Sequence, residues 1–148
     1  MGQAALLALR GPALGAPAPD PAAPRALLAQ QVQSISFPNW STFGWLASGR
    51  RIDEIGGHQA VTVYYSHGSR TIAYTIVALP ALSWPAASSQ EVAGTQFESF
   101  PMSRRLVITW RRAGETCILS GVGSSPRTLM QLAAWEPQQP AASASSLY

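Results

Sequence analysis

The chain has 148 residues, of which 47% are hydrophobic and only 11% are charged. This composition excludes a wholly disordered protein, because enough apolar surface can be buried to offset the ordering entropy. All ten basic residues are arginine and there is one cysteine, which excludes lysine-based covalent chemistry and an internal disulfide. The net charge of +3 comes from isolated arginine pairs interleaved with acidic residues, and it predicts no nucleic-acid partner.

The chain starts with an interrupted apolar stretch and a proline-rich linker. Arg10, Gly11 and Pro12 cut the apolar stretch far below the run of about 20 residues that spans a membrane. Either the start is mis-set or the chain begins near the end of a membrane helix. Five prolines in residues 11–24 predict a semi-rigid spacer. We therefore expect an apolar remnant and linker at 1–24, an α+β sensor-like domain at 25–136 and a disordered tail at 137–148.

A short amphipathic helix is predicted over residues 25–36. Pro24 suits a first helical turn, and Leu28, Val32 and Ile35 share one side. This side would lie on a sheet. Because the helix would also be tied to the spacer, and short helices are marginal when undocked, we expect it to be a switch between domain and membrane.

Three strands are predicted to follow as a meander. Gly56 and Gly57 separate the first two strand patterns and suit a tight hairpin. In the second strand, apolar residues alternate with Thr62 and Tyr64, which is typical of a half-buried strand. The third strand is predicted within residues 70–79, after a turn at residues 66–69.

The second half of the domain is predicted to end in a helix. Residues 80–90 read as a proline- and serine-rich loop, and residues 92–100 as one weaker strand. Residues 105–112 and 115–121 predict a hairpin around Ala113 and Gly114, and Ser125 with Pro126 predicts a capped helix whose apolar face lies on the sheet. The expected fold class is α+β, with a single antiparallel sheet of about six strands packed against an N-terminal and a C-terminal helix.

Cysteine and histidine offer neither a nucleophile nor a metal site. Cys117 lies in mid-strand without a neighbouring base, and alternation places it with Leu119 on the inner face, so it is predicted to be a buried structural residue. His58 and His67 lie beside separate turns, far from Cys117 in the sequence, and do not have the spacing of a zinc site. No catalytic residue, metal or cofactor is predicted.

Tryptophans and a polar pair supply the candidate binding residues. The five tryptophans can fill the core, which is the commoner role, or line an apolar cleft between sheet and helix. Asp53 and Glu54 would point to opposite faces of a strand, where one of them can meet Arg50 or Arg51. The candidate ligand- or partner-facing residues are Trp45, Arg50, Arg51, Asp53 and Trp84, and the expected structural residues are Cys117, Trp110 and Trp135.

Several segments between Phe37 and Trp135 together resemble a known family. They read FPNW, GWLASGRRIDEIGGHQAVTVYY, RTIAYTIVALPAL, LVITWRRAGETCILSG and LMQLAAW. This pattern resembles the extracytoplasmic domain of actinobacterial transmembrane anti-sigma factors of the zinc-finger type. The last hairpin and helix are also similar to the sheet-on-helix domains of periplasmic sigma-factor regulators and lipoprotein carriers.

The resemblance implies only the sensory half of such a protein. Family members carry a cytoplasmic zinc-binding anti-sigma domain, one membrane helix and then this outer domain, but this chain has no histidine-cysteine-cysteine motif and no complete membrane helix. The implied location is the extracytoplasmic face of the membrane, in a single-pass protein from which the given fragment would be soluble. The implied partners are a membrane helix in cis and a regulatory protein or protease, with a sigma factor reached only through the missing cytoplasmic domain.

The expected function is therefore a non-enzymatic extracytoplasmic sensor domain that controls sigma-factor release. The alternative is a periplasmic or extracellular carrier or binding domain for a lipid or another apolar ligand, and an enzyme is least favoured. An upstream extension with a membrane helix and a cysteine-histidine cluster would favour the sensor. A cleavable signal sequence alone would favour the carrier.

Overall fold

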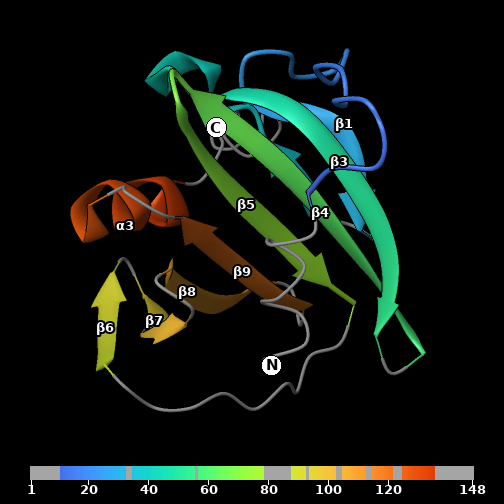
Figure 1. The fold of residues 1–148 in the computed structure, drawn as a ribbon. Coiled ribbons are helices and arrows are strands. Elements are labelled where there is room, and N and C mark those ends of the chain that lie inside the picture. The colour runs from blue at the N-terminus through green and yellow to red at the C-terminus, as the bar shows by residue number, and fades with distance from the viewer. Residues whose placement is uncertain are drawn as a thin grey trace, which may run out of the picture.

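The computed structural model describes residues 11–32, 35–55, 57–78, 88–92, 94–102, 105–112, 115–121 and 125–135. They form a mostly β fold (Figure 1), with a seven-strand antiparallel sheet, a two-strand hairpin, a 3-10 helix and one α-helix. The hairpin consists of β1 (Leu27–Val32) and β2 (Ile35–Pro38), and the 3-10 helix is η1 (Trp40–Phe43). The sheet strands are β3 (Leu46–Ile55), β4 (His58–His67), β5 (Arg70–Val77), β6 (Ser88–Val92), β7 (Thr95–Met102), β8 (Arg105–Arg112) and β9 (Glu115–Gly121), and the α-helix is α3 (Pro126–Ala134).

The sheet consists of two meanders that meet at its centre. The strand order is β3-β4-β5-β9-β8-β7-β6, so that β3 to β5 form one meander and β6 to β9 the other. Pairing of β5 with β9 places Ile76 opposite Cys117 and joins the two. The predicted hairpins β3-β4 and β8-β9 are both confirmed, with Ile55 opposite His58 and Arg112 opposite Glu115.

The predicted C-terminal helix is confirmed, cap included. The Ser125 hydroxyl accepts a hydrogen bond from the Thr128 backbone N–H at 3.1 Å, and a proline occupies the first turn. Leu129, Leu132 and Ala133 are the buried residues of α3, and the helix packs against β8 and β9. The helix therefore covers one end of one face of the sheet (Figure 1). We name this covered face the inner face and the opposite one the outer face.

The predicted N-terminal helix is wrong, because residues 27–38 form the β1-β2 hairpin instead. The register of this hairpin shifts between Leu27 and Gln31. Leu28 and Val32 both reach the core, because residues four apart share a face of a β-strand as well as one side of a helix. Their spacing therefore imitates the period of a helix. The hairpin covers the inner face, where the Tyr65 hydroxyl donates a hydrogen bond to the Pro38 carbonyl at 2.7 Å.

The region before β8 contains two strands rather than one, which makes the sheet seven-stranded. The single strand predicted for residues 92–100 is a β6-β7 hairpin with Val92 opposite Thr95. Gly94 turns the chain at a φ of 85°, a left-handed conformation that glycine adopts without strain. Residues 88–90 belong to β6 and not to the predicted loop, because the alternation signal is weak in so polar an edge strand. The rest of that loop, with Trp84, lies outside the described residues.

Both faces of the central strands are buried, so the prediction of a half-buried strand is also wrong. The inner face carries large apolar side chains such as Val61, Tyr74 and Leu119. The outer face of the same strands carries Thr62 and Thr75, which are equally buried, beside apolar residues such as Ile118. The two threonine hydroxyl oxygens lie 2.7 Å apart in a hydrogen bond. Threonine at alternate positions therefore marks a second buried face here and not a solvated one.

Residues 11–20, which we name the N-terminal arm, lie along the domain. The backbone N–H groups of Ala13 and Leu14 donate to the Arg50 carbonyl at 2.9 and 2.8 Å, and the Arg50 N–H donates to the Leu14 carbonyl at 3.1 Å. Further on, the Ala29 N–H donates to the Ala18 carbonyl at 2.7 Å. The arm thus pairs with the edge of β3 and with β1. The proline-rich segment predicted to be a spacer is bound to the domain over this length.

Two sequence expectations lie at the ends of the chain. Residues 1–10 and the predicted tail 137–148 are outside the described residues, and the domain boundaries stay predictions. Within the described ranges, the structure contains no helix that combines the length and the hydropathy needed to cross a membrane.

Candidate ligand-binding pocket

A pocket of about 190 Å³ lies on the inner face beneath the C-terminal turn of α3. We name it the aromatic pocket. Its wall includes the rings of Trp40, Tyr74, Phe97, Trp110 and Trp135. Apolar cavities of roughly 150 Å³ in other proteins accommodate benzene. The aromatic pocket is therefore large enough for one ring with a small substituent.

The aromatic wall follows from the alternation of neighbouring strands. Tyr74 of β5, Trp110 of β8 and Phe97 of β7 all point to the inner face. Their ring centroids lie 5.5 Å apart for Tyr74 and Trp110, and 5.3 Å apart for Trp110 and Phe97. Trp40 of η1 continues this series, because its ring stacks on Tyr74 at 5.5 Å and 18°. Rings at these separations attract each other and form a continuous aromatic wall, in which the Tyr74–Trp110 and Trp110–Phe97 pairs are inclined at 49° and 45°.

One polar group of this wall has no partner within the described structure. The Trp40 side chain is only 1% exposed, and its indole Nε1–H forms no hydrogen bond. A buried donor without an acceptor costs about 1–3 kcal/mol. An acceptor on a bound molecule would remove this cost if it reached the indole nitrogen.

Polar side chains also lie at this end of the sheet, namely those of Tyr74, Cys117 and Arg112. Burial raises the pKa of the Tyr74 hydroxyl well above its usual range, and burial also raises the pKa of the Cys117 thiol to about 11. Both groups are therefore neutral near pH 7. Arg112 lines the pocket, and no acidic side chain is among the described residues that line it. The charge contributed by this lining is thus positive.

Two open grooves flank α3 beside the aromatic pocket. One, of about 620 Å³, is lined by Phe43, Trp45 and Trp135 among others, and the other, of about 660 Å³, runs past Met130 and Leu106. Trp135 lines both the first groove and the aromatic pocket, and its ring meets the edge of Phe43 at 5.3 Å. The two grooves together therefore extend along α3 from Pro126 to Trp135.

Among the described residues, the structure does not gather the predicted binding residues into one site, although Arg51 and Asp53 form an ion pair. Trp45 is buried beside the first groove, with its ring 5.3 Å from that of His67. The Arg50 guanidinium donates to the Gln30 side-chain oxygen of β1 at 2.8 Å. Trp84 lies outside the described residues. Of the expected structural residues, Trp110 and Trp135 line the pocket, while Cys117 is fully buried on the inner face, as the alternation predicts.

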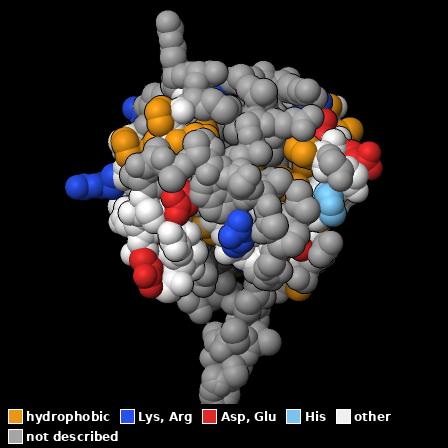
Figure 2. Space-filling model, turned by 90° about the horizontal axis from the view of Figure 1, so that it is seen from below, with side chains coloured by type: hydrophobic (Ala, Val, Ile, Leu, Met, Phe, Trp, Pro, Cys, Tyr) orange, Lys and Arg blue, Asp and Glu red, His pale blue; other side chains and the backbone are white. Residues whose placement is uncertain are grey.

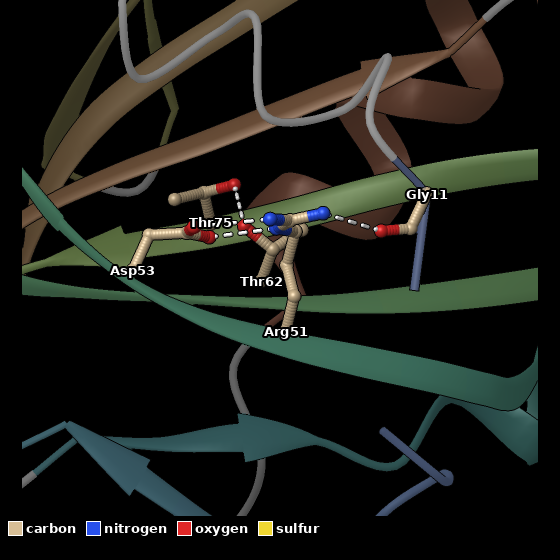
Figure 3. A network of polar contacts seen from close by, with 5 residues as sticks. All are labelled: Gly11, Arg51, Asp53, Thr62 and Thr75. Atoms are coloured by element: carbon tan, nitrogen blue, oxygen red, sulfur yellow. Dashed lines mark hydrogen bonds and ion pairs between the residues drawn. The ribbon is translucent and has the colours of Figure 1, made fainter. Parts of the chain in front are cut away.

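Arg51 and Asp53 form an ion pair on the outer side of β3 (Figure 3). Arg51 Nε and Nη2 donate to the two carboxylate oxygens of Asp53 at 2.8 and 3.1 Å, and Arg51 Nη1 donates to the Gly11 carbonyl at 3.0 Å. The hydrogen bond to Asp53 raises the pKa of Arg51. This guanidinium therefore links β3 to the N-terminal arm, beside the Thr62–Thr75 pair drawn in the same figure.

Neither the face drawn in Figure 2 nor the described histidine, cysteine and acidic side chains point to a second site. In the view of Figure 2, the coloured arginine and acidic side chains are scattered, and the arginines form no continuous patch. No group of three or more histidine, cysteine, aspartate or glutamate side chains among the described residues could hold a metal ion.

Sequence reasoning missed Trp40, Tyr74, Phe97 and Arg112 as a group. Inner-face alternation was a sufficient signal for Tyr74 alone. The place of Trp40 depends on how η1 packs, which no local pattern reports.

Fold and pocket together define a mostly β domain with a ring-sized aromatic pocket. The chain matches no protein-family model, no curated protein and no solved structure.

Proposed function

We propose that this chain is a non-enzymatic regulatory domain whose signal is a small molecule bound in the aromatic pocket. The observation that carries the proposal is a ring-sized space bounded by stacked aromatic side chains, with the buried donor of Trp40 in its wall. Pockets of this kind, apolar with a few polar groups, are the usual form of small-molecule sites.

The resemblance to extracytoplasmic domains of actinobacterial transmembrane anti-sigma factors supports a sensory role. In that setting the domain lies outside the membrane, and ligand binding alters release of a sigma factor through parts of the protein beyond this chain. A membrane helix in cis and a regulatory protein or protease would be its partners. The N-terminal arm, which is bound to β1 and β3, is the segment that would face those parts.

The second candidate is a carrier of small apolar ligands. The same pocket supports it, but the size of the pocket argues against a long lipid chain. Phe37 and Trp40 occupy the inner face where an acyl chain would need space, and both are fully buried. A sensor differs from a carrier in that its ligand must bind two conformations with different affinity.

Binding can be tested with toluene and benzoate as probes, followed by NMR of the domain. We expect shifts confined to the residues that line the aromatic pocket. Ala133→Leu should block binding because Ala133 lines the pocket, whereas Gln131→Leu adds the same side chain to α3 beside the open grooves. If no probe binds, or if both variants behave alike, the pocket is not the site.

Hydrogen exchange separates the sensor from the carrier. In a sensor, the bound probe must change exchange of amides outside the pocket, because the ligand shifts a conformational population. We expect altered protection at Leu129 in α3 or at Leu14 in the arm. Slower exchange at the pocket lining alone would instead fit a carrier.

A further inference from the structure

We propose that the aromatic pocket selects a single-ring compound that bears a carboxylate or a similar small anionic group. The proposal deepens the function proposed above and rests on it, since it names the class of molecule that the pocket takes. Three features of the pocket support it, namely its size, its unpaired donor and the sign of its charge.

Size limits the ligand to one ring. The space of about 190 Å³ is larger, by about one small substituent, than an apolar cavity of roughly 150 Å³ that holds benzene in another protein. Aromatic rings make up much of the wall, with Trp40 stacked on Tyr74 and Trp110 inclined to Phe97 at 45°. An aromatic ligand can meet such rings face to face or edge to face, which a branched or flexible chain cannot do.

Two polar groups of the pocket can only donate, whereas the hydroxyls of Tyr74 and Thr95 in the same lining can donate or accept. Trp40 Nε1 can donate but cannot accept a hydrogen bond, and it lacks an acceptor within the described structure. Arg112 is also a donor only, with a permanent charge. An acceptor on a ligand that reached the indole nitrogen would pair this N–H, whereas a ligand with only donor groups would leave it unpaired.

Charge favours an anion over a neutral acceptor. Arg112 is the one charged side chain among the described residues of the lining. Glu115 stands opposite Arg112 in the register of β8 and β9 but is not among those residues, and burial raises its pKa. A carboxylate in the pocket would thus lie near the guanidinium of Arg112, and hydrogen bonds to charged groups are stronger than those between neutral groups.

The test compares benzoate, benzamide and toluene, which share a ring and differ in charge and in acceptor. We expect affinity to fall in that order in the intact domain, with benzoate about tenfold tighter than benzamide. Arg112→Gln should abolish the difference between benzoate and benzamide. Arg111→Gln is the matched control, because Arg111 is adjacent in β8 but exposed. It removes the same charge from the protein without touching the pocket lining.

Trp40 is tested in the unaltered protein as well as in a variant. The indole N–H resonance of Trp40 should move downfield with benzoate and benzamide and stay in place with toluene. Trp40→Phe should weaken the binding of benzoate and benzamide and leave the affinity for toluene unchanged. If Arg112→Gln does not fold, Arg112→Lys keeps the charge and should retain the benzoate preference, and added salt should reduce that preference in the wild type.

The outcomes are distinguishable from failure of the proposed function. If benzoate and benzamide bind equally, or if Arg111→Gln and Arg112→Gln change the ratio alike, the anionic class is wrong although the pocket still binds rings. If toluene binds as tightly as benzoate and the indole resonance never moves, the inference that the ligand carries a hydrogen-bond acceptor is wrong too. If none of the three binds, the proposed function itself fails.

Discussion

Replacing Gly49 by alanine should release the N-terminal arm from β3. A Cβ atom at position 49 would lie 2.4 Å from Pro12 Cβ and 2.9 Å from Pro12 Cγ. Real Cβ atoms do not approach other carbons so closely, and the proline ring is too stiff to move aside alone. The arm must therefore shift away from the edge of β3, where the register is already irregular between Ala47 and Gly49.

The cost can be worked from the hydrogen bonds that the shift removes. Ala13 and Leu14 donate to the Arg50 carbonyl, Arg50 donates to Leu14, and Arg51 donates to Gly11. A net contribution of about 0.5–1.5 kcal/mol each, at the lower end for a sheet edge and a shared acceptor, gives about 2 kcal/mol. Alanine in a strand recovers about 0.5–1 kcal/mol relative to glycine. The net loss is thus about 1–1.5 kcal/mol.

Hydrogen exchange measures this loss directly. The amides of Ala13 and Leu14 should exchange about tenfold faster in Gly49→Ala than in the wild type, because a change of about 1.4 kcal/mol is a factor of ten. Amides of β4 should be unaffected. Gly15→Ala is the matched control, since it lies in the same arm and nothing lies within 4 Å of its added Cβ. If Gly49→Ala and Gly15→Ala leave the arm equally protected, the close approach is not what holds it.

Three further changes test the burial of polar groups. Thr62→Val should cost about 1–3 kcal/mol because the Thr75 hydroxyl loses its partner, while the double valine variant should be close to neutral in a urea-unfolding cycle. Cys117, with its pKa raised to about 11 by burial, should resist a thiol reagent until the protein unfolds, and rapid native labelling would contradict this. Burial raises the pKa of Glu115, so its folded form holds the proton to higher pH than its unfolded form. Stability should therefore fall as pH rises from the unfolded to the folded pKa, and Glu115→Gln should remove this part of the pH dependence of urea unfolding.

Local sequence patterns predicted most strands and the C-terminal helix correctly. Alternation and turn glycines were enough for β3, β4, β5, β8 and β9, and the cap at Ser125 was enough for α3. The hairpin β1-β2 was not predicted because the four-residue spacing of Leu28 and Val32 places them on one face in a strand and on one side in a helix, so it does not distinguish the two. The burial of the threonines on the outer face was not predicted, for a different reason. A hydroxyl that is paired across strands, such as that of Thr75, cannot be told from a solvated one in a single sequence.

The candidate site was predictable only in part. The proximity of Asp53 to Arg51 follows from residues two apart sharing a face of a strand, and the structure confirms that the two meet. Their partner, the Gly11 carbonyl, lies 40 residues away and could not be predicted. The aromatic pocket is likewise non-local, because Trp40, Tyr74 and Trp110 come from three separate elements.

The pocket and the N-terminal arm are joined through the β1-β2 hairpin, which takes the place of the expected helical switch. Trp40 of the pocket wall follows Asn39, whose N–H donates to the Ala26 carbonyl at 2.9 Å just before β1. Within β1, Ala29 donates to Ala18 of the arm. A ligand that repositions Trp40 therefore acts on the element that binds the arm. Coupling of this kind is reciprocal, so a release of the arm by Gly49→Ala should change benzoate affinity by the same factor that benzoate changes the docking of the arm. Equal benzoate affinity in Gly49→Ala and Gly15→Ala, with the arm released only in the former, would show that the hairpin transmits nothing.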